Sequence, residues 1–193
     1  MVGRLMENSS RQRSIEGLSS DGPYPEFKDK LMLFGQFVGD WDIVGVQSPS
    51  PSGVAFEERG EVHFGWILDG RAVQDVWMTY DEKSKRAISV GTTIRVYDPS
   101  IDAWLSTWIS AIRRSVQTFV ARQVGERIVL EGTTKEGYPE RWIFSEIKPE
   151  SFRWYSEETH DGGNSWILTE EMRIRRRNTG AETEGELDIG KDF

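Results

Sequence analysis

The sequence contains no cysteine, which excludes disulfide bonds, thiolate nucleophiles and cysteine-ligated zinc or iron–sulfur centres. Histidine is also scarce, with only His63 and His160. Two alternatives remain: a metal site made of both histidines and a carboxylate, or a haem held by one axial histidine. No further residues in the sequence point to either site. We therefore expect no metal and no cofactor.

Long apolar runs are missing as well. No stretch approaches the ~18 apolar residues that a membrane helix needs, and residues 1–20 lack the apolar core of a signal peptide. Net charge is −8, which disfavours binding to a phosphate backbone. Neither a glycine-rich phosphate loop nor a Gly-x-Ser-x-Gly signature occurs. We expect a cytoplasmic protein that binds neither nucleic acid nor membrane.

Large aromatic residues are abundant. Hydrophobic residues make up only 37%, yet the chain has 8 Trp, 9 Phe and 5 Tyr, and such side chains build a core from few residues. The length suits one domain with tails. Residues 1–22 are polar and aperiodic, and residues 178–193 are acidic. We predict a disordered arm over 1–22, a folded domain over 23–177 and a disordered acidic tail over 178–193.

One segment is predicted to be helical, Tyr24–Val38. Pro23 and Pro25 suit a first turn, and Gly39 ends the pattern. The apolar residues recur at spacings of three to four, as one face of a helix requires; they are Phe27, Leu31, Phe34 and Val38.

The rest of the domain is predicted to be strands, because β-branched and aromatic residues alternate with polar ones between short turns. The predicted strands are 41–47, 54–67, 71–80, 88–97, 104–110, 115–123, 127–132, 140–147, 152–160 and 165–175. Short connections favour antiparallel neighbours. The pattern predicts a mainly β fold, an antiparallel up-and-down barrel of about 8–10 strands with an N-terminal α-helix, and a sandwich is the competing architecture.

A barrel of this size has room for one small ligand. Trp104 and Trp108 share one strand face with Ser106. Aromatic walls with a few hydroxyls are typical of small-molecule pockets, although such residues also fill ordinary cores. The predicted ligand-binding residues are Trp66, Asp75, Trp77, Trp104, Ser106, Trp108, Arg141, Trp154, Glu158 and Glu170.

Four of these residues are charged. If they face inward they need partners, and Arg141 with Glu158 or Glu170 would make an internal pair. If they face outward they are an ordinary solvated surface. A buried glutamate with a raised pKa could also transfer protons.

A family resemblance follows from the motifs. Gly39-Asp40-Trp41 opens the first strand, and arginines lie on the last strand. This resembles the lipocalin, or calycin, pattern, in which the Trp closes one barrel end and stacks on an Arg, here Arg173 or Arg175. The stretches WILDGRAVQDVW, GTTIRVYDPSIDAW, RWIFSEIKPESFRWYSEET and DGGNSW resemble bacterial lipocalin-like proteins of unknown function, over about residues 35–175. The resemblance implies a barrel that binds a small apolar or amphipathic ligand, and it carries over no catalytic residue.

The sequence thus predicts a lipocalin-like protein that binds a small organic molecule, with Trp41 as a structural plug. An enzyme on the same barrel, of hydratase, isomerase or decarboxylase type with Glu158 or Glu170 as acid–base group, is one alternative. An oligomerisation module, such as a homodimer with Trp on an outer face, is another.

Overall fold

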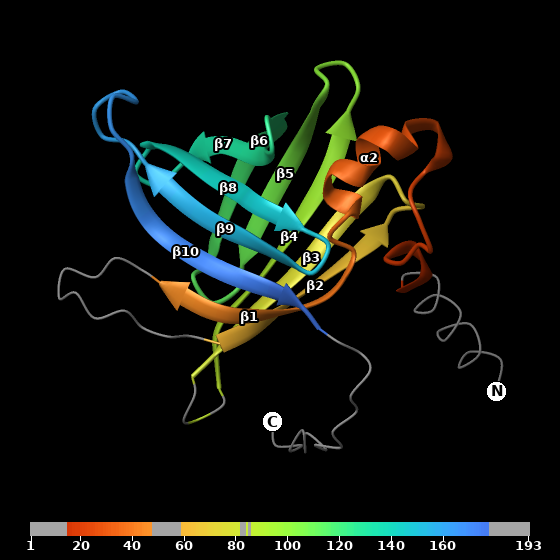
Figure 1. Cartoon of the computed structure of the whole chain (residues 1–193), viewed down its shortest axis with the longest axis horizontal. Helices are drawn as coiled ribbons and strands as arrows, with labels where there is room; N and C mark the ends of the chain where they lie inside the picture. Colours follow the sequence, from red (N-terminus) through yellow and green to blue (C-terminus); the bar gives the residue numbers. More distant parts are fainter. Residues whose placement is uncertain (1–14, 48–58, 82–83, 85, 178–193) are drawn as a thin grey trace, which may run out of the picture.

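Ten antiparallel strands close into one barrel in the computed structural model, which describes residues 15–47, 59–81, 84 and 86–177 (Figure 1). Each strand pairs with its neighbour in sequence, and the first pairs with the last. The strands are β1 Gly39–Gln47, β2 Arg59–Ile67, β3 Ala72–Tyr80, β4 Ala87–Asp98, β5 Ala103–Ser110, β6 Ser115–Val124, β7 Arg127–Thr133, β8 Pro139–Lys148, β9 Ser151–Glu158 and β10 Ile167–Arg176. The predicted up-and-down barrel is confirmed.

The helix is shorter than predicted. A 3-10 turn, η1 Pro25–Phe27, leads into α2 Lys28–Gly35, and α2 lies at one end of the barrel (Figure 1). Turn-type bonds from the amides of Phe37 and Val38 follow it. Gly39 then starts β1 with φ +124°, a conformation that favours glycine.

The predicted arm and tail fall largely outside the described residues, which leave out 1–14 and 178–193. Within the arm, Ser20 forms a bridge to Trp66, its amide donating to the Trp66 carbonyl at 2.9 Å. Among the described residues, no helix has the length and apolar character needed to span a membrane.

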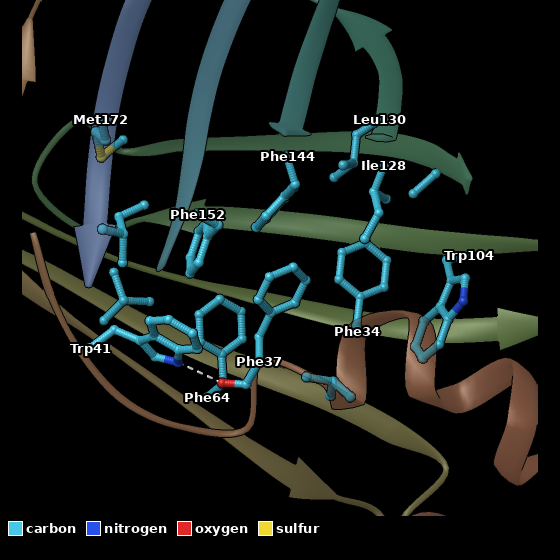
Figure 2. Packing of buried hydrophobic residues seen from close by; sticks show 14 of the residues in the cluster. Phe34, Phe37, Trp41, Phe64, Trp104, Ile128, Leu130, Phe144, Phe152 and Met172 are labelled. Atoms are coloured by element: carbon cyan, nitrogen blue, oxygen red, sulfur yellow. Dashed lines mark hydrogen bonds between the residues drawn. The ribbon is translucent and has the colours of Figure 1, made fainter. Parts of the chain in front are cut away.

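Aromatic rings fill the barrel end under α2 (Figure 2). Phe37 is 1% exposed, and its ring centroid lies 4.8 Å from that of Phe152 and 5.1 Å from that of Phe144. Phe34 meets Trp104 edge-on at 5.0 Å. This end of the barrel is therefore a packed aromatic core.

Trp41 closes this end, as the Gly-x-Trp motif predicts. It is 1% exposed, and its Nε1 donates to the carbonyl of Phe37 at 2.6 Å. The stacking arginine is Arg176, whose Cζ lies 4.0 Å from the Trp41 ring centroid. The choice of Arg173 or Arg175 is wrong because alternation turns both outward, where they are exposed, while Arg176 is the β10 residue opposite Trp41.

Candidate functional site

A cavity of about 310 Å³ begins where the aromatic core ends. Phe64, Phe144 and Phe152 belong both to the core and to the cavity wall, so they form its floor. Arg113 and Ser115, in and beside the β5–β6 turn, line the opposite part. The cavity therefore occupies the barrel end away from α2.

Four tryptophans form a belt around the middle of the cavity. Successive ring centroids lie 5.8, 5.9 and 5.4 Å apart, and each pair meets edge to face. The tryptophan belt consists of Trp77 on β3, Trp108 on β5, Trp142 on β8 and Trp154 on β9. Because these strands lie on different sides of the barrel, the belt offers aromatic surface to a ligand from several directions.

Gly91 on β4 sets the position of Trp108. A Cβ at residue 91 would lie 2.0 Å from the Trp108 ring, so any side chain there would displace the indole. The ring lies directly on the β4 backbone and is held from the other directions by Trp77 and Trp142. The belt is thus positioned by a close approach that only glycine permits.

A buried ion pair lies on the cavity wall beside the floor. Arg95 Nη1 is 2.6 Å from Asp75 Oδ2, and the side chains are 3% and 6% exposed. Asp75 also accepts a hydrogen bond from the amide of Thr93 at 3.0 Å. The guanidinium lies 4.8 Å from the ring centroid of Phe34, so the ion pair lies where the aromatic core meets the cavity.

Several donors here lack a hydrogen-bond partner among the described residues. They are Nε and Nη1 of Arg95, Nε1 of Trp77 and the hydroxyl of Ser89, and all three residues line the cavity. The Arg95–Asp75 contact is close enough for charge attraction, but Nη1 is not aligned to donate. A buried donor without an acceptor destabilises a fold by about 1–3 kcal/mol. The wall of the cavity therefore presents unused hydrogen-bonding capacity.

Glu140 lines the cavity near the β5–β6 turn, the end that we call the mouth. Its Oε1 accepts from Trp142 Nε1 and its Oε2 from Gln117 Nε2, both at 2.8 Å. Desolvation by burial raises the pKa of the Glu140 carboxyl, these two hydrogen bonds oppose the shift, and the negative charge of Glu158 adds to it. The raised carboxyl pKa thus belongs to a residue that the sequence analysis did not select.

Glu158 and Glu170 also line the cavity. Glu158 Oε1 lies 2.8 Å from His160 Nε2, and that imidazole stacks on Tyr138 with centroids 4.0 Å apart. On β10 the register with β9 shifts between Leu168 and Glu170. This bulge brings two consecutive residues, Thr169 and Glu170, to the cavity wall.

Six predicted site residues come together on the cavity wall. They are Asp75, Trp77, Trp108, Trp154, Glu158 and Glu170. Whether they bind a ligand stays a prediction.

The other four predicted residues lie elsewhere. Trp66 packs on Gly35 of α2, and Trp104 packs on Phe34, so both belong to the closed end. Ser106 is 2% exposed within β5 and is not among the cavity-lining residues. Arg141 faces outward, with Cζ 3.8 Å from the Trp166 ring centroid and Nε 3.5 Å from Glu131 Oε1.

The cavity wall also contains residues that the sequence pattern did not single out, among them Arg95, Gln117, Glu140 and Trp142. On β8 the prediction used the face of Arg141 and Ile143, whereas the inward face carries the alternate residues. The signal was present, because Trp142 and Phe144 make that other face the more aromatic one. Arg95 lies between aliphatic neighbours and gave no sign of an inward position.

Neither histidine lines the cavity. His63 is 2.6 Å from Asp40 at Nδ1, and His160 is held between Tyr138 and Glu158. Over the described ranges, no group of three or more His, Asp or Glu side chains is arranged to hold a metal ion.

The closed ten-strand barrel, plugged by α2 at one end and hollow at the other, is a lipocalin-like fold. No family model matches the chain, and no curated protein matches its sequence. Among solved structures, Rv2717c from M. tuberculosis is similar, with a TM-score of 0.55 and 14% identity over 81% of this chain and 99% of that one. The S-type phycobiliprotein lyase CPES from Guillardia theta has a TM-score of 0.50 and 13% identity over 78% and 93%. At these identities the likeness is one of fold.

Proposed function

We propose that this protein binds a small amphipathic organic molecule in the barrel. The observation that carries the proposal is the tryptophan belt above a buried Arg95–Asp75 pair, in which Nε and Nη1 of Arg95 lack a hydrogen-bond acceptor among the described residues. A cavity of about 310 Å³ whose wall combines aromatic rings with polar and charged side chains suits a small ligand that has both an apolar and a polar part.

The apolar body of the ligand would lie within the tryptophan belt. Indole rings bury large areas, and edge-to-face packing of aromatic groups adds to the gain from apolar burial. A planar, ring-containing body fits these surfaces better than a long flexible chain, because it loses less conformational entropy on binding.

The inner end of the ligand would carry a hydrogen-bond acceptor, such as a carbonyl, ether or hydroxyl oxygen. Arg95 Nε has a donor to offer it, while Trp77 Nε1 and the Ser89 hydroxyl offer further donors along the cavity wall. An uncharged acceptor suits this place because Asp75 already balances the charge of Arg95.

Native mass spectrometry of the gently purified protein tests the proposal. We expect a species heavier than the chain by the mass of one small molecule, lost on mild activation. Trp108→Ala should lose it, and Trp166→Ala, which changes a tryptophan outside the cavity, should keep it. Equal retention in both variants would place the molecule elsewhere.

A second candidate, an enzyme with acid–base chemistry, is favoured by the raised pKa of Glu140 at a cavity wall. If the protein is such an enzyme, the bound molecule should exchange a carbon-bound proton with D₂O or be converted into a product. Glu140→Gln should abolish this exchange or conversion. A ligand recovered unchanged and free of deuterium would contradict the enzyme and leave ligand binding as the proposed function.

A further inference from the structure

The outer half of the cavity carries an excess of negative charge. Asp75 and Arg95 balance each other near the floor. Towards the mouth, the cavity is lined by the paired carboxylates of Glu140 and Glu158, against one guanidinium, on Arg113. Arg113 lies in the exposed β5–β6 turn, where water screens its charge, whereas Glu140 and Glu158 are half-buried.

The two carboxylates are neighbours. Glu140 on β8 and Glu158 on β9 are directly paired residues of the sheet, and both side chains line the cavity. Like charges at opposed positions destabilise a sheet. Hydrogen bonds from Trp142 and Gln117 to Glu140, and the contact of Glu158 with His160, offset part of this repulsion. A cation between the two carboxylates would offset more of it.

The tryptophan belt favours the same sign of ligand charge. The face of an indole ring is electron-rich and attracts a cation within about 6 Å of its centroid. Trp142 connects the two features, because its Nε1 donates to Glu140 while its ring meets Trp108 and Trp154. An anionic end group would be repelled by both.

We propose that the cavity selects organic cations: a protonated amine or a quaternary ammonium on an aromatic body, with the body in the tryptophan belt and the cation between Glu140 and Glu158. This inference rests on the proposed function and adds the charge of the ligand. The unused donors near Arg95 are a separate sign that the same cavity receives a molecule.

Three probes of nearly equal size test it: 2-(1-naphthyl)ethylamine, 2-(1-naphthyl)ethanol and 1-naphthaleneacetate. Each is titrated into the full chain at neutral pH by calorimetry. We expect the amine to bind on the order of tenfold more tightly than the alcohol, and the acetate more weakly than either. The affinity of the amine should fall as salt rises, and that of the alcohol should not.

Three glutamate variants show which carboxylates attract the amine. Glu158→Gln and Glu140→Gln should each weaken amine binding roughly fivefold, the scale of a partly exposed charge pair, and leave alcohol binding unchanged. Glu131→Gln is the matched control, since it removes one carboxylate from the outer face of β7, where the side chain is 58% exposed. Circular dichroism confirms that each variant is folded, and the two inner variants give independent readings.

The outcomes separate the two proposals. Equal affinity for all three probes, or an equal loss in Glu131→Gln, would overturn the charge selection and leave the proposed function standing. Failure of all three probes to bind would count against both.

Discussion

Arg95 and Asp75 form an ion pair inside the barrel, with Nη1 of the guanidinium 2.6 Å from Oδ2 of the carboxylate. Burial of such a pair is costly, and the pair is stable only while both partners remain. Asp75→Ala should therefore lower the free energy of unfolding by about 3–5 kcal/mol, as measured by chemical denaturation.

Removal of both charges provides the matching comparison. Asp75→Leu combined with Arg95→Met should recover most of that loss, because no unpaired charge remains. It should also weaken ligand binding, because the unused donors of Arg95 disappear. A double variant as unstable as Asp75→Ala would show that the pair acts through something other than its charge.

The plug at the closed end should affect stability without affecting binding. Trp41→Ala should cost about 3–5 kcal/mol, the range for truncation of a large core aromatic. Arg176→Ala should cost less, because it removes a cation–π contact and hydrogen bonds to the carbonyls of Val38, Gln36 and Pro149 from a partly exposed side chain. Thermal unfolding and probe titration of each folded variant check both statements; a large affinity loss in a stable variant would contradict them.

Gly91 should be required for the geometry of the tryptophan belt. Gly91→Ala places a Cβ 2.0 Å from the Trp108 ring, which has little room to move, so we expect a loss of about 1–3 kcal/mol and weaker probe binding. Gly65→Ala is the control, because a Cβ there meets nothing within 4 Å. If both variants behave alike, the close approach of Trp108 to β4 has no energetic consequence.

The pH dependence of stability should report Glu140. Its carboxyl pKa is raised in the folded protein above the ordinary value of 4.5, chiefly by burial. The folded state then binds more protons than the unfolded state just above pH 4.5, so stability falls as the pH rises through this window and is not lost below it.

Glu140→Gln removes this effect. It should stabilise the protein at pH 7 by up to about 1 kcal/mol, the scale of a cross-strand charge pair, and make no difference at pH 4. Melting temperatures of both proteins at the two pH values, with Glu131→Gln as control, test this. A variant less stable than the natural protein at pH 7 would mean that the hydrogen bonds from Trp142 and Gln117 outweigh the burial of charge.

The strands could be predicted because alternation and turn residues are local signals. The direction in which each strand faces could not, because a period of two defines two faces and names neither as inner. Arg141 illustrates this: it lies on the outer face of β8, while Glu140 and Trp142 face the cavity. The same alternation explains why Arg176, and not Arg173 or Arg175, stacks on Trp41.

The depth of a side chain within the barrel could not be predicted from the sequence either. Trp104 and Trp108 share one face of β5, yet the first packs on Phe34 and the second lines the cavity. Which of the two lines the cavity depends on how far α2 and the aromatic core fill the barrel, a tertiary property that no local pattern records.

Indole N–H resonances give the most direct test, since the chain has eight tryptophans and each reports its own position. In a ¹⁵N–¹H correlation spectrum titrated with 2-(1-naphthyl)ethylamine, we expect shifts for Trp77, Trp108, Trp142 and Trp154. The resonance of Trp41, whose Nε1 is bonded to the Phe37 carbonyl in the closed end, should stay in place, and so should that of Trp166. Shifts confined to Trp41 or Trp166, with the four belt resonances unmoved, would contradict a ligand site in this cavity.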